Sequence, residues 1–315
     1  MLLRDFILWL STKKRLTDFL ARRGMRSGFA RRFVAGERLE DAVAASLVLQ
    51  QLGHGVILNH LGENVATREE AARTRDSYIE MIHALESAGL RGNISIKPTQ
   101  LGLDLGRDLC QSLAIEIAQE AKRLGRTIEV DMENSTYTGV TLDIFEEMQR
   151  KTGNVGLAVQ AYLRRTEADL ERLAPLSPKI RLVKGAYREP ARVAFQKKSE
   201  VDENYRRLAD LLLAPAGEHR FFAAIGTHDP AMVEYACKRI EQNALGKDRY
   251  EFQMIYGIRR DLQQQLLAQG HPMQIYVPFG TDWCPYFMRR LAERPANCWF
   301  VLRNLLAERK PATSR

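Results

Sequence analysis

Eight short apolar segments alternate with longer amphipathic stretches from about residue 55 onward, and this alternation restricts the possible folds more than any other feature. The segments are residues 56–59, 94–97, 127–131, 156–160, 180–184, 221–226, 250–255 and 274–278. They are rich in Val, Ile, Phe and Tyr and end in polar or glycine residues, which is typical of buried parallel strands. We therefore expect eight parallel strands joined by helices.

The intervening stretches space their apolar residues about 3.6 positions apart, which predicts helices. The clearest are residues 69–88, 108–124, 204–213 and 230–242. Thr141, Thr166 and Asp229 occupy expected N-cap positions, and Asp229 precedes Pro230, a favoured first helical residue. Eight strand and helix alternations favour a closed (βα)8 barrel of the TIM type, with an open doubly wound sheet as the alternative.

The first 52 residues precede the first predicted strand and are expected to be helical, with residues 39–52 amphipathic. We therefore divide the chain into an N-terminal helical arm, residues 1–52, and a barrel, residues 53–315. The formal net charge is +8, and residues 1–33 carry nine Lys and Arg against two Asp. The rest of the chain is nearly neutral, which argues against a nucleic-acid partner.

The cysteines and the apolar start of the chain bear on its cellular location. Cys110, Cys237, Cys284 and Cys298 form no CxxC pair, which predicts neither a disulfide framework nor a metal site and suits the cytoplasm. Residues 1–10 are apolar but interrupted by charge, and fall short of the roughly 20 residues that span a bilayer. An arginine-rich, acid-poor start is also typical of a transit peptide.

Polar and charged residues collect where the predicted strands end, and a (βα)8 barrel forms its active site there. These residues are Glu63, Lys97, Asp131, Gln160, Arg181, Lys184, Tyr187, Thr227, His228, Gln253 and Tyr276. A buried charge must be paired or must shift its pKa, so their convergence on one barrel mouth indicates a ligand site. The sequence contains no glycine-rich nucleotide-binding motif, zinc-protease motif or nucleophile elbow.

Two adjacent arginines, Arg289 and Arg290, lie on a helix predicted over residues 283–293, with Glu293 three residues later. Guanidinium groups bind carboxylates through paired hydrogen bonds, so this pair suits a carboxylate ligand over the barrel mouth. A solvated basic patch with a salt bridge to Glu293 is the alternative.

Several segments resemble the proline dehydrogenase family and occur in the family's order. They are Leu61-Gly62-Glu63, Ile94-Ser95-Ile96-Lys97, Arg181-Leu182-Val183-Lys184-Gly185-Ala186-Tyr187, Thr227-His228, Glu251-Phe252-Gln253, Tyr276-Val277-Pro278-Phe279-Gly280 and Arg289-Arg290-Leu291-Ala292-Glu293. The resemblance implies a distorted barrel of the monofunctional bacterial type, too short to include an aldehyde dehydrogenase partner domain. It also implies noncovalent FAD and oxidation of L-proline to 1-pyrroline-5-carboxylate by hydride transfer to flavin N5, the first step of proline catabolism to glutamate.

The resemblance also implies roles for individual residues. Asp131 and Tyr187 match catalytic positions of the family. The substrate positions are Lys97, Ile255, Tyr276, Arg289 and Arg290. The FAD positions are Met132, Gln160, Arg181, Val183, Lys184, Gly185, Ala186, Thr227, His228 and Gln253. Glu63 and Arg181 match an ion pair that is similar to a gate over the site.

If Arg289 binds the proline carboxylate, Arg289→Met should raise the KM for L-proline more than about tenfold, because a charged hydrogen bond contributes about 1.5 to 3 kcal/mol. Steady-state kinetics over a range of proline concentrations measure this change. An unchanged KM would remove Arg289 from the site.

The remaining expectations concern competing reactions and the electron acceptor. Lys97 or Lys184 at a strand end could instead form a Schiff base, as in aldolases of this fold. The family resemblance implies that a quinone in the membrane accepts the electrons of the reduced flavin. We therefore expect residues 1–33 to lie on an anionic membrane surface at the inner face of the cell membrane, with Phe6, Leu8, Trp9 and Leu10 inserted. A helix packed on the barrel is the alternative.

Overall fold

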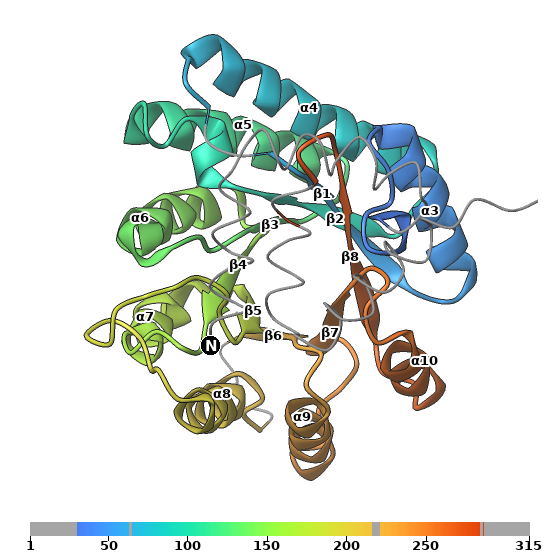
Figure 1. Ribbon diagram of the computed structural model, residues 1–315, viewed down its shortest axis with the longest axis vertical. Helices are drawn as coiled ribbons and strands as arrows, with labels where there is room; N and C mark the ends of the chain where they lie inside the picture. Colours follow the sequence, from blue (N-terminus) through green and yellow to red (C-terminus); the bar gives the residue numbers. More distant parts are fainter. Residues whose placement is uncertain (1–29, 63–64, 216–220, 284–285, 287–315) are drawn as a thin grey trace, which may run out of the picture.

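The computed structural model describes residues 30–62, 65–215, 221–283 and 286. Its eight strands are parallel and follow each other around a closed barrel, in which β8 pairs with β1 (Figure 1). The strands are β1 (Gly55–His60), β2 (Gly92–Ile96), β3 (Ile128–Val130), β4 (Val155–Gln160), β5 (Lys179–Val183), β6 (Phe222–Gly226), β7 (Tyr250–Ile255) and β8 (Met273–Phe279). The predicted closed barrel is confirmed, because the ring of strands has no open edge.

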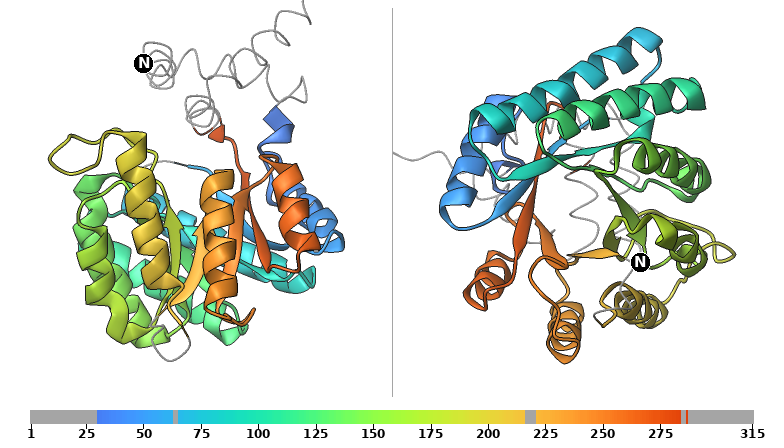
Figure 2. Two further views of the ribbon diagram at one scale, coloured as in Figure 1. Left: turned by 90° about the horizontal axis from the view of Figure 1, so that it is seen from below. Right: turned by 180° about the vertical axis from the view of Figure 1, so that it is seen from behind.

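Helices surround the ring of strands, as two further views show (Figure 2). They are α3 (Leu39–Gln51), α4 (Arg68–Ser87), α5 (Arg107–Arg123), α6 (Ser135–Thr152), α7 (Thr166–Leu173), α8 (Lys198–Leu212), α9 (Pro230–Gln242) and α10 (Arg260–Ala268). The predictions for α4, α5 and α9 agree within one residue. The predicted start of α8 at residue 204 is six residues late, because the first turns, Lys198 to Glu203, are mostly polar and carry little apolar signal.

One of the three predicted N-caps is confirmed. The side chain of Asp229 accepts a hydrogen bond from the Ala231 N–H at 3.1 Å and caps α9. The N-cap prediction for Thr141 is wrong, because Thr141 lies buried inside α6, whose N-cap is Asn134. Thr166 is wrong by one position, since it is the first residue of α7 and its hydroxyl donates to the Gln160 carbonyl at 2.6 Å.

The outer face of the barrel wall and the inner faces of the helices form the main apolar core, which includes Val56, Leu58 and Ile94. The barrel interior is different, because alternate positions of several strands carry charged or amide side chains that bond across the barrel. Gln253 on β7, for example, donates to Glu129 on β3 at 2.9 Å. Since side chains of a strand alternate between its two faces, apolar residues can pack outward while polar residues point inward from the same strand.

The interior polar residues form an ion-pair network near the amino-terminal ends of the strands. Lys179 bonds to Glu129 at 2.9 Å and to Glu251 at 2.7 Å, while the Arg181 Nε lies 3.4 Å from Glu129. Burial alone would raise the pKa of Glu129, but Lys179 and Arg181 outweigh it and hold that pKa below its ordinary value. Each charge is therefore matched, which a buried ion pair requires if it is not to destabilise the fold.

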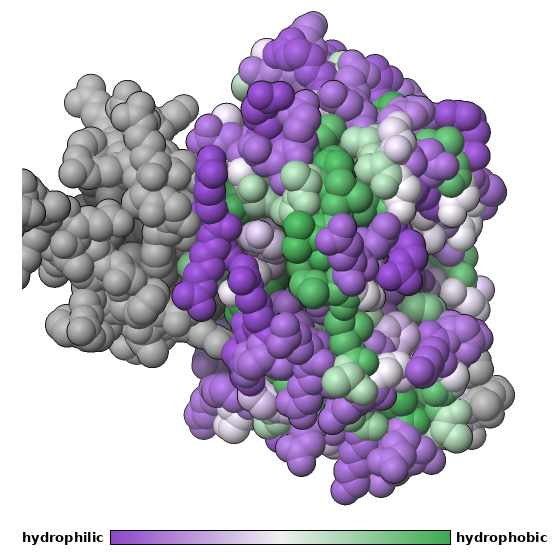
Figure 3. All heavy atoms as spheres, turned by 90° about the vertical axis from the view of Figure 1, so that its right-hand side faces the viewer, coloured by the Kyte–Doolittle hydropathy of each residue, from purple (hydrophilic) through white to green (hydrophobic). Residues whose placement is uncertain are grey.

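The segment around α3 lies against the first and last strands. The Ala35 N–H donates to the Pro278 carbonyl at 2.9 Å, and the Gly280 N–H donates to the Gly36 carbonyl at 3.0 Å. The face with α3 and α10 carries a band of apolar side chains among polar ones (Figure 3). On and just after α3, the large apolar residues Leu47, Val48 and Leu52 are exposed. The division of the chain at residue 52 stays a prediction. Within the described ranges, no helix is both long and apolar enough to cross a membrane.

Candidate active site

A cavity of about 690 Å³ opens at the carboxyl ends of the strands, and a smaller one of about 200 Å³ adjoins it. They share lining residues, including Asp131 and Tyr276. The larger cavity is lined by the predicted residues Lys97, Asp131, Met132, Gln160, Val183, Lys184, Gly185, Ala186, Tyr187, Thr227, His228 and Tyr276. The smaller cavity adds Arg181, Gln253 and Ile255. Every predicted site residue that the structure describes therefore lines one of these cavities, although their roles stay predictions.

Three residues of the predicted site, Glu63, Arg289 and Arg290, lie outside the described part of the chain. The predicted membrane residues Phe6, Leu8, Trp9 and Leu10 lie outside it as well. The structure does place Arg181, the expected gate partner of Glu63, and pairs it with Asp131 and Glu129 in the barrel interior. The gate and the arginine pair accordingly remain predictions.

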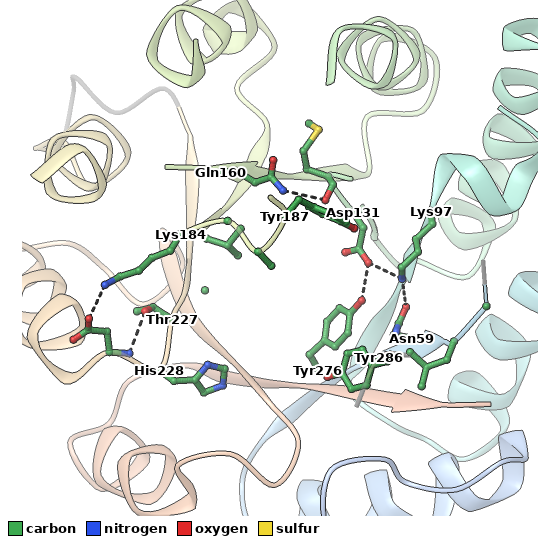
Figure 4. A pocket seen from close by; sticks show the side chains of 18 of the residues that line it. Asn59, Lys97, Asp131, Gln160, Lys184, Tyr187, Thr227, His228, Tyr276 and Tyr286 are labelled. Atoms are coloured by element: carbon green, nitrogen blue, oxygen red, sulfur yellow. Dashed lines mark hydrogen bonds and ion pairs between the residues drawn. The ribbon is translucent and has the colours of Figure 1, made fainter. Parts of the chain in front are cut away.

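Asp131 is the centre of the polar group at one end of the larger cavity (Figure 4). It follows β3, and its Oδ2 accepts hydrogen bonds from the Lys97 Nζ at 2.9 Å and the Tyr276 hydroxyl at 2.6 Å. Its Oδ1 accepts from the Ser95 hydroxyl at 2.6 Å and from the Arg181 guanidinium. This carboxylate thus joins side chains from β2, β5 and β8.

The charges of this group stay fixed over a wide pH range. Burial would raise the pKa of Asp131, but Lys97 and Arg181 outweigh it and hold that pKa well below its ordinary value. Burial would also lower the pKa of Lys97, but Asp131 outweighs it and raises that pKa. The phenol of Tyr276 has its pKa raised well above 10 by burial and by Asp131. At neutral pH the group therefore contains a carboxylate, an ammonium and an uncharged phenol.

Two residues that were not predicted from the sequence hold this group in place. Asn59 on β1 is buried, and its Oδ1 accepts from the Lys97 Nζ at 2.7 Å. Ser95 on β2 donates to Asp131 and lies two positions before Lys97, on the same face of the strand. Both are small polar residues at alternate positions of apolar strands, and that pattern could have identified them.

The opposite end of the cavity lies between β5 and β6, where Figure 4 shows Lys184, Thr227 and His228. The Lys184 Nζ donates to Asp229 Oδ2 at 2.5 Å, and the Thr227 hydroxyl oxygen accepts from the Asp229 N–H at 3.2 Å. The His228 Nε2 accepts from the Ile255 N–H at 2.8 Å, so that nitrogen carries no proton. This end therefore presents a basic side chain next to the start of α9.

Gly185 at this end requires glycine for two reasons. Its φ is +106°, in a region that L side chains rarely adopt. A Cβ there would also lie 2.2 Å from the Tyr162 ring. The chain can therefore turn sharply between Lys184 and Tyr187, which brings both side chains to the cavity.

Two buried amide oxygens in the cavity walls accept no hydrogen bond from any residue that the structure describes. They are the Oε1 atoms of Gln160 and Gln253. The Nε2 atoms of both side chains are already donors, for Gln160 to the Met132 and Glu133 carbonyls and for Gln253 to Glu129 and Glu251. A buried acceptor without a donor costs free energy, so a ligand with an N–H or O–H group fits here.

The chain is similar to known proteins both in sequence and in fold. The family model described as Proline dehydrogenase matches residues 42–303. The chain is 37% identical over 305 residues to Proline dehydrogenase 1 of Bacillus subtilis (strain 168), covering 97% of this chain and 99% of that protein. It is 41% identical over 282 residues to Proline dehydrogenase of Deinococcus radiodurans, covering 88% and 90% of the two chains.

Among solved structures, the fold is similar to proline utilization A (PutA) of Bdellovibrio bacteriovorus inactivated by N-propargylglycine. The TM-score is 0.77 at 23% identity, a likeness that supports the fold alone, and the match covers 84% of this chain. The chain spans 32% of the length of that solved chain. The family model and the near full-length relatives carry the assignment instead, and the chain belongs to the proline dehydrogenase family.

Proposed function

We propose that the chain oxidises L-proline to 1-pyrroline-5-carboxylate, with L-proline and noncovalently bound FAD held together in the cavity at the barrel mouth. The observation that carries the proposal is the division of this cavity. One end holds the charged group around Asp131, and the other holds Lys184 and the start of α9. The charged group around Asp131 suits a small zwitterion, and the end with Lys184 suits a large cofactor with phosphates.

The Asp131 end suits the substrate. The Lys97 ammonium has three donor hydrogens, of which two go to Asn59 and Asp131, so the third is available for a carboxylate. Tyr187, Tyr276 and Ile255 supply aromatic and apolar surface for the proline ring. Arg289 and Arg290 would complete the carboxylate site from the last predicted helix.

The other end and the floor of the cavity suit FAD, which when bound supplies the two-electron acceptor that the amino acids of the chain lack. An isoalloxazine ring has one N–H donor and several acceptors, and Gln160 or Gln253 offers the acceptor that this N–H needs. Met132 and Val183 provide apolar surface beside them. Lys184 provides a cation toward the phosphates.

Within this scheme Asp131 acts by holding other groups and not by accepting a proton. Its depressed pKa keeps it ionised at neutral pH, and its four hydrogen bonds orient Lys97, Arg181, Ser95 and Tyr276. Tyr276 remains a protonated donor because its pKa is raised. The chain thus contributes orientation and electrostatics, as expected for an enzyme whose cofactor performs the redox step.

The decisive experiment is anaerobic reduction of the purified protein. The protein should be yellow, and L-proline should bleach its flavin absorbance while D-proline, the enantiomer control, bleaches it much more slowly. A protein without flavin, or a flavin spectrum unchanged by L-proline, would contradict the proposal.

A Schiff-base reaction is disfavoured by the state of Lys97. An amine nucleophile requires a lowered pKa, whereas Asp131 raises that of Lys97 above its ordinary value. Borohydride treatment with a small carbonyl compound such as pyruvate, from which a reactive lysine forms an imine, should therefore leave the protein mass unchanged. An adduct on Lys97 would revive the aldolase alternative.

For the electron acceptor we propose a quinone in the membrane. We propose that this protein is cytoplasmic and reaches the quinone by binding the inner face of the membrane with residues 1–33. Replacing Phe6, Leu8, Trp9 and Leu10 with Ser should abolish sedimentation with anionic liposomes. The control replaces the exposed apolar residues Leu47, Val48 and Leu52 with Ser and should leave sedimentation unchanged. Equal liposome binding by the first variant and the wild type would disprove the membrane proposal.

A further inference from the structure

Lys198, the first residue of α8, belongs to a cluster of four charged side chains at the cofactor end of the cavity. We call Lys184, Lys198, Asp202 and Asp229 the rim cluster. Asp202 bonds to both lysines, and Asp229 Oδ2 lies 2.5 Å from the Lys184 Nζ and 3.3 Å from the Lys198 Nζ. Lys184, Lys198 and Asp229 all line the larger cavity, next to Thr227 and His228.

Stability of the fold does not account for Lys198 in this cluster. Its side chain is 73% exposed, and its bond to Asp202 is an i,i+4 pair on the helix surface. Such exposed pairs stabilise a protein little, since solvent screens them and holding two side chains costs entropy. Asp202 and Asp229 would also keep Lys184 as a partner without Lys198. The position of Lys198 at the cavity therefore calls for a partner that enters the cavity.

The rim cluster differs from the Asp131 group in how easily its bonds can be exchanged. The Asp131 and Arg181 side chains are only 14% and 6% exposed, and the Asp131 carboxylate accepts four hydrogen bonds. The rim cluster is open to solvent through Lys198. A diphosphate is strongly hydrated, so it suits the open end, where the exposed Lys198 can turn from a carboxylate to a phosphate.

We propose that Lys198 binds the phosphates of the cofactor, and that Asp229 competes with those phosphates for Lys184 and Lys198. The proposal rests on the proposed binding of FAD. The two lysines and two aspartates carry no net charge together, so the cluster attracts an anion only when lysines leave Asp229. Asp229 cannot leave this competition by protonation near neutral pH, because hydrogen bonds from Lys184 and Lys198 overcome the effect of burial and lower its pKa to about 2.

The competition predicts that removing a lysine charge and removing an aspartate charge change the Kd of FAD in opposite directions. Lys198→Met leaves the cluster with one excess negative charge and should raise the Kd of FAD about fivefold or more, since charge-assisted bonds to phosphate are the strong ones. Asp229→Asn leaves one excess positive charge and should lower that Kd about threefold, while the asparagine still caps α9. Lys197→Met is the matched control, as Lys197 is exposed, adjacent and not part of the cavity lining.

The test is titration of the full-length protein, freed of flavin, with FAD and with riboflavin, followed by flavin fluorescence. Riboflavin has the same ring system without phosphates, so Lys198→Met should leave its affinity unchanged. A Lys198→Met variant that binds FAD like the wild type overturns the inference and leaves the proposed function intact. Equal losses for FAD and riboflavin also overturn it, because Lys198 would then act through the fold. A wild-type protein that binds no FAD removes both proposals together.

Discussion

Asp131→Asn should lower kcat/KM for L-proline about 10- to 100-fold, because a charged hydrogen bond that orients Lys97 contributes about 1.5 to 3 kcal/mol and each 1.36 kcal/mol of activation free energy is a factor of ten. The carboxylate holds Lys97 and Arg181 together, and their side chains are only 16% and 6% exposed. An asparagine keeps the shape but cannot neutralise either cation. The Lys97 ammonium would then lose the ion pair that orients it. Steady-state kinetics with L-proline and an artificial acceptor measure this effect.

The matched control for Asp131 is Asp169 on α7. Asp169 is also buried and is bonded by the Arg165 guanidinium, but it lines neither of the two cavities. Asp169→Asn should leave kcat/KM nearly unchanged. If Asp131→Asn retained wild-type activity, the carboxylate would have no part in placing Lys97.

Glu129→Gln should lower the free energy of unfolding by about 3 kcal/mol, since removal of one partner leaves buried charges without compensation. Glu129 is fully buried and receives Lys179 at 2.9 Å, Gln253 at 2.9 Å and Asn93 at 3.1 Å. A glutamine can keep part of the hydrogen bonding, but leaves Lys179 and Arg181 with less compensating charge. Urea unfolding at neutral pH measures this loss.

Glu129 also makes a prediction about pH. Its pKa is lowered from 4.5 in the folded protein by Lys179 and Arg181, against the effect of burial. Its ionisation therefore contributes stability that is fully present above about pH 4.5 and is lost as the pH falls through the lower folded-state pKa. The wild type should lose more stability than Glu129→Gln between neutral and acidic pH. Parallel loss in the two proteins would contradict this account.

The control for the stability change is Glu86→Gln. Glu86 bonds to Arg126 at 2.7 Å, but its side chain is 52% exposed. Because solvent screens this exposed carboxylate, its pair with the less exposed Arg126 contributes about 1 kcal/mol or less. A loss for Glu86→Gln as large as that for Glu129→Gln would mean that burial is not the cause.

The strands could be predicted closely because their signal is local. The segment predicted over residues 250–255 is β7 without change, and the segment over residues 274–278 is β8 without its two end residues. Helix starts were less predictable. The polar beginning of α8 resembles a solvated loop, and the cap of α6 is an asparagine seven residues before the threonine that the pattern favoured.

The candidate site divides in the same way. Lys97, Asp131 and Lys184 could be predicted because each follows or ends an apolar strand, where a barrel places its mouth. Asn59 and Ser95 were missed because a single small polar residue within an apolar segment gives a weak signal. Lys198 was missed because a lysine in a charged segment is most often solvated, and only the fold brings it beside Lys184.

By itself, the sequence determined the alternation of strands and helices and the placement of polar residues at strand ends, because both are periodic or positional features of neighbouring residues. Only the tertiary structure decided the partners. Asp131 on one side of the barrel meets Tyr276, which lies 145 residues later, and Glu129 meets Gln253, which lies 124 residues later. The physical reason is closure of the barrel. When β8 pairs with β1, inward side chains from distant strands face one another across a narrow interior, and no local pattern specifies which of them meet.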